Sequence, residues 1–167
     1  YVALASFDGY SRRAEDAQYL RSFFVDLDVG DGKGYDSKAD ALRALSGFTE
    51  EKGLPDPVVV DSGTGVHAYW IFDQDVPATE WKVYAEKFKA FCLNNGLNID
   101  PVVTADTARI LRVPGTANNK KKYAQPRPVR IVQEGDIFDF STFSPLVYEK
   151  LVEVPPPPTP KVDLPGQ

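Results

Sequence analysis

The stretch Phe23-Phe24-Val25-Asp26-Leu27-Asp28-Val29 decides the fold and raises its main question. Its apolar residues predict a buried β-strand, because the run is short and rich in aromatic and β-branched side chains. Two aspartates nevertheless interrupt it at alternate positions. Residues two apart in a strand point to the same side of a sheet, about 6.6 Å apart along the strand. Asp26 and Asp28 are therefore expected to project together from one face of the sheet.

Such a pair of carboxylates predicts a divalent metal site. Two carboxylates held this close repel each other and resist ionising together unless a cation lies between them. Mg²⁺ and Mn²⁺ prefer hard oxygen ligands of this kind, and enzymes that use two ions hold them about 3.5–4 Å apart with carboxylate clusters. The alternative is that both aspartates lie at the solvated end of the strand, because Asp-x-Asp is a common sequence.

The elements around this strand predict an α+β domain. One helix is expected to begin after the cap Ser37 and to stop at Gly53; a second is expected between Thr79, as its cap, and Gly96. Helices and strands do not alternate in a regular βαβ order, and the gap after the second strand is too short for a crossover helix. A mixed or antiparallel sheet with helices on one side is therefore expected. The expected strands comprise residues 23–29, 57–61, 67–72, 109–113 and 128–132.

The glycine-rich stretch Asp61-Ser62-Gly63-Thr64-Gly65-Val66-His67 predicts a tight turn between two strands. Backbone N–H groups in such a turn can face an anion, so Ser62, Gly63, Gly65 and His67 are candidates for contact with nucleotide phosphate. The stretch lacks the Gly-x-x-x-x-Gly-Lys-Ser/Thr spacing of a Walker loop. His67 is the only histidine, and a structural role for it stays open.

Basic residues are concentrated in one part of an acidic chain. The net charge of −5 disfavours a protein that coats nucleic acid over its whole surface, yet seven basic residues and no acidic ones lie between Thr107 and Arg130. This pattern predicts a confined anion site. Arginine and lysine beside a metal suit a triphosphate, and the candidates are Arg109, Arg112 and Lys120. Lys121 and Lys122 fit a solvated basic rim better.

A third acid is expected to complete the metal cluster. Asp100, which follows the apolar Ile99, and Asp106, which precedes the basic strand, are the two candidates. Arg109 and Arg112 are three positions apart and would point to opposite faces of a regular strand. One of them is therefore expected to pair with an acid or to mark a bend.

The order of these stretches resembles the archaeo-eukaryotic primase superfamily, and most of all the primase–polymerases of phages, plasmids and mobile elements. The matching segments are Asp26-Leu27-Asp28, residues 62–67, Ile99-Asp100 and the Arg-x-x-Arg and Pro-Gly-Thr-x-Asn-x-Lys segments that follow. Together they span about residues 23–122. The resemblance implies an RRM-like sheet with a smaller N-terminal α/β part formed by the residues before Phe23.

The resemblance also implies template-directed nucleotidyl transfer, as a DNA primase or DNA polymerase, with two Mg²⁺ or Mn²⁺ ions. The expected partners are a single-stranded DNA template, a primer and nucleoside triphosphates. The metal-binding acids of the family match Asp26, Asp28 and Asp100, and its nucleotide-binding groups match Ser62, Gly63, Gly65, His67, Arg109, Arg112 and Lys120.

Other features set the expected context. One cysteine, Cys92, and one histidine exclude an internal disulfide and a zinc module, so primer extension is expected rather than initiation without a primer. Residues 1–150 are expected to form the catalytic domain, and residues 151–167 a proline-rich linker to a helicase or another replication domain. No apolar run approaches the ~18 residues of a membrane helix, and a cytoplasmic protein of a bacterial host or its equivalent is expected.

Two alternatives remain open. One is a replication-origin or single-stranded DNA-binding module that keeps the fold without polymerase activity. The other is a different Asp-x-Asp metal-dependent enzyme, either a nuclease or a transferase such as a glycosyltransferase, which would leave the ordered basic residues unexplained.

Overall fold

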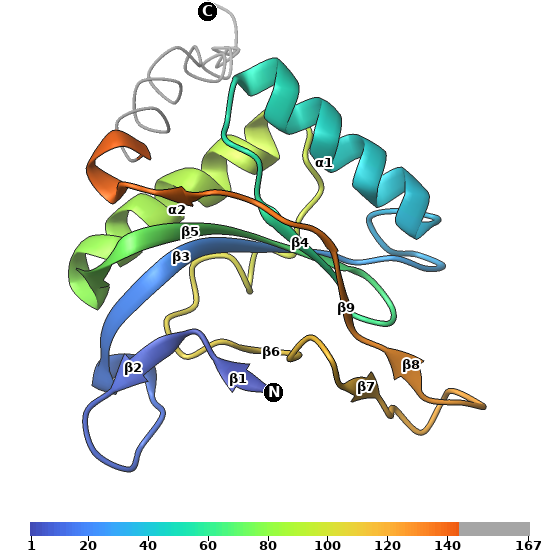
Figure 1. The fold of residues 1–167 in the computed structure, drawn as a ribbon, viewed down its shortest axis with the longest axis horizontal. Coiled ribbons are helices and arrows are strands. Elements are labelled where there is room, and N and C mark those ends of the chain that lie inside the picture. The colour runs from blue at the N-terminus through green and yellow to red at the C-terminus, as the bar shows by residue number, and fades with distance from the viewer. Residues whose placement is uncertain (144–167) are drawn as a thin grey trace, which may run out of the picture.

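The computed structural model describes residues 1–143, and its centre is a six-stranded sheet (Figure 1). The strand order is β2-β3-β5-β4-β9, and β10 also pairs with β5. All pairs are antiparallel except β10 with β5, so the sheet is mixed and the α+β prediction is confirmed. The strands are β1 Val2–Ala3, β2 Ala5–Phe7, β3 Ala17–Leu27, β4 Val58–Asp61, β5 Val66–Pro77, β6 Ile110–Leu111, β7 Ala117–Asn118, β8 Arg127–Pro128, β9 Arg130–Gln133 and β10 Ile137–Phe138.

Two helices, α1 Lys38–Lys52 and α2 Ala78–Asn94, cover the same face of this sheet (Figure 1). The α1 helix begins as predicted, because the Ser37 hydroxyl accepts a hydrogen bond from the backbone N–H of Asp40 at 3.2 Å. It ends at Gly53, which adopts the left-handed conformation with φ 58° that glycine tolerates best.

The predicted cap of α2 was wrong. Pro77, the last residue of β5, occupies the N-cap position, and Thr79 lies inside the first turn. The proline ring fixes a φ close to that of a helix, so the chain passes from strand to helix without a separate capping residue. The helix ends at Asn94, just before Gly96, whose φ is 80°.

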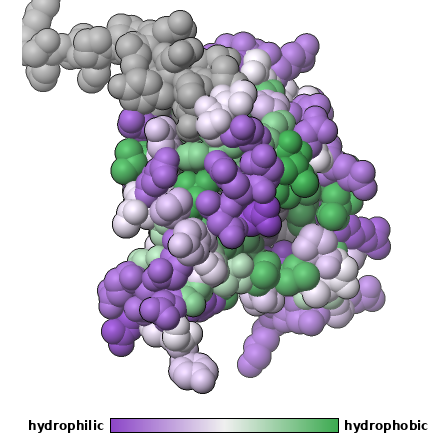
Figure 2. Space-filling model, turned by 60° about the vertical axis from the view of Figure 1, so that its left-hand side comes forward, coloured by the Kyte–Doolittle hydropathy of each residue, from purple (hydrophilic) through white to green (hydrophobic). Residues whose placement is uncertain are grey.

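The core between the helices and the sheet is rich in aromatic rings. Phe23 of β3 lies 5.0 Å from Phe72 of β5 and 5.2 Å from Phe88 of α2, measured between ring centroids. The indole N–H of Trp81 donates to the carbonyl of Ser22 at 2.8 Å, which satisfies a buried polar group at this contact. On the face seen in Figure 2, hydrophobic side chains form separate patches among hydrophilic ones. Cys92 is fully buried in the core.

The strand predicted at residues 109–113 is shorter than expected. Only Ile110 and Leu111 form strand β6, which pairs with the two-residue strand β1 in a separate small sheet. Arg112 and Val113 lie outside any strand, and Pro114 after them cannot donate to a ladder.

Part of the segment before Phe23 belongs to the main sheet, and β1 belongs to the small sheet with β6. The segment comprises β1, β2, the 3₁₀ helix Ala14–Asp16 and the first part of β3. β2 pairs with β3 and extends the main sheet. Among residues 1–143, no helix is long and apolar enough to cross a membrane. The expected linker, residues 151–167, lies outside the described residues.

Candidate active site at one end of the sheet

Three acids meet at the end of β3. Asp26 is the penultimate residue of this strand, and Asp28 follows it on the same side. The backbone N–H of Asp100 donates to the backbone carbonyl of Asp26 at 2.8 Å. The segment that carries Asp100 thus runs beside β3, and a third carboxylate joins the pair although 72 residues of sequence separate Asp28 from Asp100.

The pKa of the Asp26 carboxyl is raised by its burial and by the negative charges beside it. Burial raises the pKa of its carboxyl from 3.8 to about 7, and the neighbouring carboxylates of Asp28 and Asp100 add to this rise. Arg109 and Arg112 oppose it. A carboxylate that is this reluctant to ionise is stabilised by any cation that binds beside it.

A lysine already lies against this cluster. Lys33, in the loop after β3, places its ammonium group 3.1 Å from a carboxylate oxygen of Asp28. The loop is closed by hydrogen bonds between Gly30 and Tyr35 and between Tyr35 and Asp28. An open cavity of about 330 Å³ is lined by Asp28, Lys33 and Asp100 together with neighbouring backbone. The sequence offered a signal for Lys33, since it is the one basic residue of the glycine-rich loop 30–34.

His67 lies directly across from Asp26. The two residues are register partners in β5 and β3, and 3.8 Å separates the His67 Nε2 from an Asp26 carboxylate oxygen, which is too long for a hydrogen bond. The other ring nitrogen lies 3.2 Å from the hydroxyl of Tyr69, which the sequence did not single out. Burial, with the charges of Arg112 and Arg109, lowers the His67 pKa from 6.5 to about 4, so the ring is neutral at pH 7.

The glycine-rich turn joins β4 to β5, as predicted. The Ser62 hydroxyl accepts from the N–H of Gly65 at 3.1 Å and lies 3.0 Å from its carbonyl, so it closes the turn from within. Gly63 has a φ of 85°. A side chain at Gly65 would lie 2.6 Å from the carbonyl oxygen of Leu27, which means that glycine allows β3 and the turn to touch. Contact of this turn with phosphate stays a prediction.

The charges of both arginines reach the site. Arg109 and Arg112 each lower the pKa of Asp26 and of His67, and Arg112 lies outside strand β6, which ends at Leu111. Arg109 Nε lies 3.9 Å from a carboxylate oxygen of Asp106, so the predicted pairing with an acid is present.

Both carboxylate oxygens of Asp106 already have partners close by in sequence. One carboxylate oxygen accepts the N–H of Ala108 at 2.9 Å, and the other faces Arg109. Within residues 1–143, Arg109 Nε is nevertheless a buried donor without a hydrogen-bond partner. Such a donor is costly to leave unpaired and favours an anion nearby.

A second open cavity, of about 350 Å³, lies beside Arg112 and Lys120. Its other lining residues are Tyr1, Thr116, Ala117, Asn118 and Asn119. The Arg112 guanidinium lies 5.3 Å from the centre of the Tyr1 ring. Two cations and several small polar side chains around one hollow make a suitable environment for an anion.

The acids fit divalent cations by their chemistry. They supply hard carboxylate oxygens, and their mutual repulsion favours bound positive charge. Within the described part of the chain, no three Asp, Glu, His or Cys side chains are already arranged around a metal-sized position. The backbone brings the three acids together, and their side chains would close on an ion by rotation.

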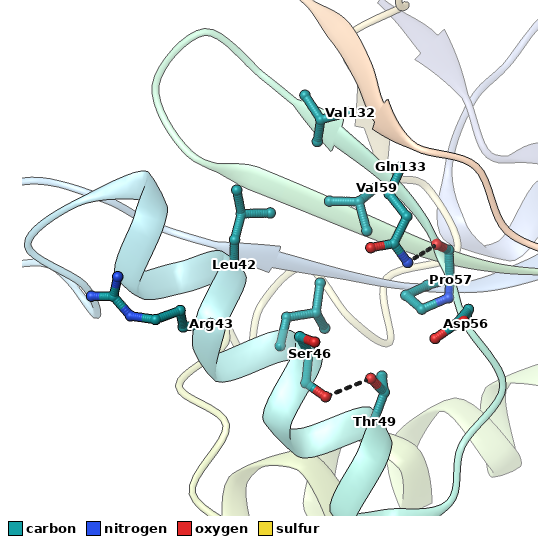
Figure 3. Close-up of a pocket in the computed structure, with 10 residues that line it drawn as sticks. Leu42, Arg43, Ser46, Thr49, Asp56, Pro57, Val59, Val132 and Gln133 are labelled. Atoms are coloured by element: carbon teal, nitrogen blue, oxygen red, sulfur yellow. Dashed lines mark hydrogen bonds between the residues drawn. The ribbon is translucent and has the colours of Figure 1, made fainter.

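Another pocket lies elsewhere on the molecule, between α1 and the strands β4 and β9 (Figure 3). Leu42, Val59 and Val132 line its apolar part. At its rim, the Gln133 amide donates to the carbonyl of Pro57 at 3.2 Å. Its lining contains none of the predicted site residues, so the acid cluster remains the better candidate for chemistry.

Comparisons with known proteins found one similar sequence and one similar structure. No family model matches the chain. A replication protein of Clostridium perfringens is 32% identical over 126 residues, which covers 73% of this chain, and the chain spans only 30% of that relative's length. The archaeo-eukaryotic primase domain of the cyanophage S-2L primase–polymerase has a similar structure, with a TM-score of 0.58 and 18% identity, covering 88% of this chain and 68% of that one.

Proposed function

We propose that this chain, whose fold is that of a primase–polymerase catalytic domain, transfers nucleotides to a growing strand on a single-stranded DNA template. The observation that carries the proposal is the meeting of Asp26, Asp28 and Asp100 at the end of β3, opposite two arginines. An enzyme that uses a nucleoside triphosphate needs acidic side chains to hold metal ions and basic side chains to bind the phosphates.

The three acids have the task of holding two Mg²⁺ or Mn²⁺ ions. Such ions would supply Lewis-acid chemistry, lowering the pKa of a primer 3′-hydroxyl and neutralising charge on the phosphates, while Asp26, Asp28 and Asp100 would hold them. Asp26 is the acid most dependent on such ions, because burial and its two acidic neighbours disfavour its ionised form. Lys33 would have to leave Asp28 when an ion arrives, and it could then turn toward a phosphate.

The basic groups have the task of binding the triphosphate. Arg109 has a buried Nε–H that makes no hydrogen bond, and Arg112 with Lys120 lines an open cavity. His67 is 1% exposed and neutral at pH 7, and its Nε2 faces the Asp26 carboxylate at 3.8 Å. When the Tyr69 hydroxyl donates to Nδ1 of His67, the neutral ring carries its hydrogen on Nε2, the nitrogen that faces Asp26. Catalysis in this scheme is positioning and charge neutralisation, without a covalent nucleophile.

The wider setting forms part of the proposal. The similar protein of Clostridium perfringens is named as a replication protein, which supports a role in replication. We propose that the replicated DNA is that of a phage or another mobile element, in the cytoplasm of its host. A helicase domain or partner would supply the unwound template. Extension of a primer is the expected activity, because the chain has no cysteine and histidine set for a zinc module.

The test is a primer-extension assay with labelled nucleotides and Mn²⁺ or Mg²⁺. Asp26→Ala and Asp28→Ala are each expected to abolish incorporation, while circular dichroism shows an intact fold. Asp31→Ala, which removes an exposed acid from the neighbouring loop, is the matched control and should keep activity. Full activity in either active-site variant would refute the proposal.

Calorimetry separates the proposed polymerase from a binding module with the same fold. Binding of a nucleoside triphosphate that requires Mn²⁺ and is lost in Asp26→Ala supports the polymerase. DNA binding that ignores both the metal and the acids, in a protein that binds no nucleotide, would support the module instead.

A further inference from the structure

The hairpin formed by β7 and β8 carries three basic residues that the proposed chemistry does not use, Lys121, Lys122 and Arg127. Residues 119–126 join its two strands, and it projects from the body of the molecule (Figure 1). Lys121 and Lys122 are exposed at its tip. Between residues 107 and 133 the sequence has no acid, so nothing within the hairpin neutralises this charge.

The hairpin also carries an aromatic ring among its cations. The Arg127 guanidinium lies 4.0 Å from the centre of the Tyr123 ring, and the Lys122 ammonium lies 5.3 Å from the same centre. Tyr123 is half-buried, whereas Lys122 and Arg127 are exposed. Cations packed against an aromatic ring form the combination by which proteins hold single-stranded nucleic acids: the ring and guanidinium plane stack with bases, and the lysines contact phosphates.

The base of the hairpin is fixed to the glycine-rich turn of the candidate active site. The side-chain amide of Asn118 donates to the Ser62 carbonyl at 3.3 Å and to the Thr64 hydroxyl at 3.4 Å. Arg127 donates to the Gly63 carbonyl at 3.4 Å. A side chain at Gly63 would meet both Asn118 and Arg127 at 3.0 Å, so the two elements pack closely.

This docking relates the hairpin to the acids. The turn that it contacts leads directly into β5, where His67 faces Asp26. A strand bound along the hairpin therefore lies close to the acid cluster and not at a remote surface. The separation of roles is also clear, since Lys121, Lys122 and Tyr123 line neither the acid cavity nor the cavity beside Arg112.

We propose that the β7–β8 hairpin binds a single-stranded nucleic acid, with Tyr123 and Arg127 stacking on bases and Lys121 and Lys122 contacting phosphates. A single strand fits better than a duplex, because stacking on a side chain needs an unstacked base. The inference deepens the proposed function by naming the element that holds the template beside the acids. DNA and RNA share this chemistry, and the experiment distinguishes them.

The test is fluorescence anisotropy with labelled single-stranded DNA, single-stranded RNA of the same sequence and the corresponding duplex DNA, without metal or nucleotide. The triple variant Lys121→Ala, Lys122→Ala and Tyr123→Ala is expected to bind single strands about tenfold or more weakly. The slope of log affinity against log salt should fall by about 1.4, for two lost phosphate contacts. The control, Lys82→Ala with Lys89→Ala on α2, removes the same positive charge and should change the affinity less than about twofold.

Two further variants separate stacking from charge. Tyr123→Phe keeps the ring and should bind as the wild type does, whereas Tyr123→Ala alone should weaken binding without changing the salt slope. Equal affinity of the triple variant and the control would overturn the proposal, as would a preference of the wild type for duplex DNA. A preference for DNA or for RNA assigns the strand and supports the proposal in either case.

Failure of this inference differs from failure of the proposed function. The triple variant should still bind nucleoside triphosphate with Mn²⁺ by calorimetry, and Asp26→Ala should still bind single strands. Wild-type protein that binds strands through the hairpin but never incorporates nucleotides would refute the polymerase alone. Active protein whose strand affinity ignores the hairpin would refute the inference alone.

Discussion

Replacing Asp26 with asparagine is expected to make the metal-free domain more stable, by an amount that depends on pH. In the folded protein the pKa of Asp26 is raised from 3.8 to about 7 by burial and by the carboxylates of Asp28 and Asp100. The folded state therefore disfavours the ionised form of this carboxyl. Asparagine has a similar shape and cannot ionise, so it removes the repulsion without opening a cavity.

The size and the sign of the change in the free energy of unfolding follow from the pKa of Asp26 in the unfolded and in the folded state. A rise from 3.8 to about 7 corresponds to about 4 kcal/mol against the ionised folded state. The Asp26 side chain is 20% exposed, so water screens part of this cost and about 2 kcal/mol is expected. The wild type should lose this stability as the pH rises from 3.8 to about 7, with no further loss above. Below pH 3.8 the wild type and Asp26→Asn should be equally stable.

Urea unfolding in the presence of a chelator, at about pH 4 and about pH 8, measures the difference. The matched control is Asp136→Asn, at an exposed position of the chain, which should change little at either pH. Addition of Mn²⁺ should stabilise the wild type and not Asp26→Asn. A variant that is no more stable than the wild type at pH 8, or equally stabilised at both pH values, would refute the reasoning about the acid cluster.

Three other outcomes are expected. Gly65→Ala should destabilise the domain by about 2 kcal/mol or more in urea unfolding, because the new methyl group would lie 2.6 Å from the Leu27 carbonyl oxygen. The control is Gly47→Ala inside α1, where the new methyl group would have no atom within 4 Å and should not destabilise the domain. Trp81→Phe should lower the free energy of unfolding by about 1–3 kcal/mol, because the Ser22 carbonyl loses its donor; a smaller loss would mean that water replaces the indole. The ring signals of His67 in NMR should titrate near pH 4 and not near pH 6.5. Because the pKa of His67 is lowered in the folded state, the free energy of unfolding should decrease as the pH falls from 6.5 toward 4. A titration midpoint above pH 6 would contradict the burial of the ring.

Local chemistry accounts for the features that were predictable. Ser37 and Gly53 mark the ends of α1 through contacts within a few residues, and both predictions are confirmed. The alternation in β3 places Asp26 and Asp28 on one face in any regular strand. The exception was the start of α2, where Pro77 ended one element and began the next, so the local rule for Thr79 did not apply.

Long-range packing decided the rest of the candidate site. Nothing in the sequence near Arg109 and Arg112 shows that strand β6 contains only Ile110 and Leu111, or that the charges of both arginines act on Asp26. The contact of Lys33 with Asp28 depends on how its loop closes, and the contact of Asn118 with Ser62 joins residues 56 positions apart.

The sequence by itself determined which groups can do chemistry here: acids at alternate positions of one strand, one glycine-rich turn with a histidine, and a basic segment without acids. Those are properties of residue order and of a strand's two-residue repeat. Only the tertiary structure decided which third acid lies beside the pair, because the backbone of Asp100 bonds to Asp26 while Asp106 faces Arg109. Such choices depend on contacts between distant segments, which form only when burial of the common core fixes where each segment lies.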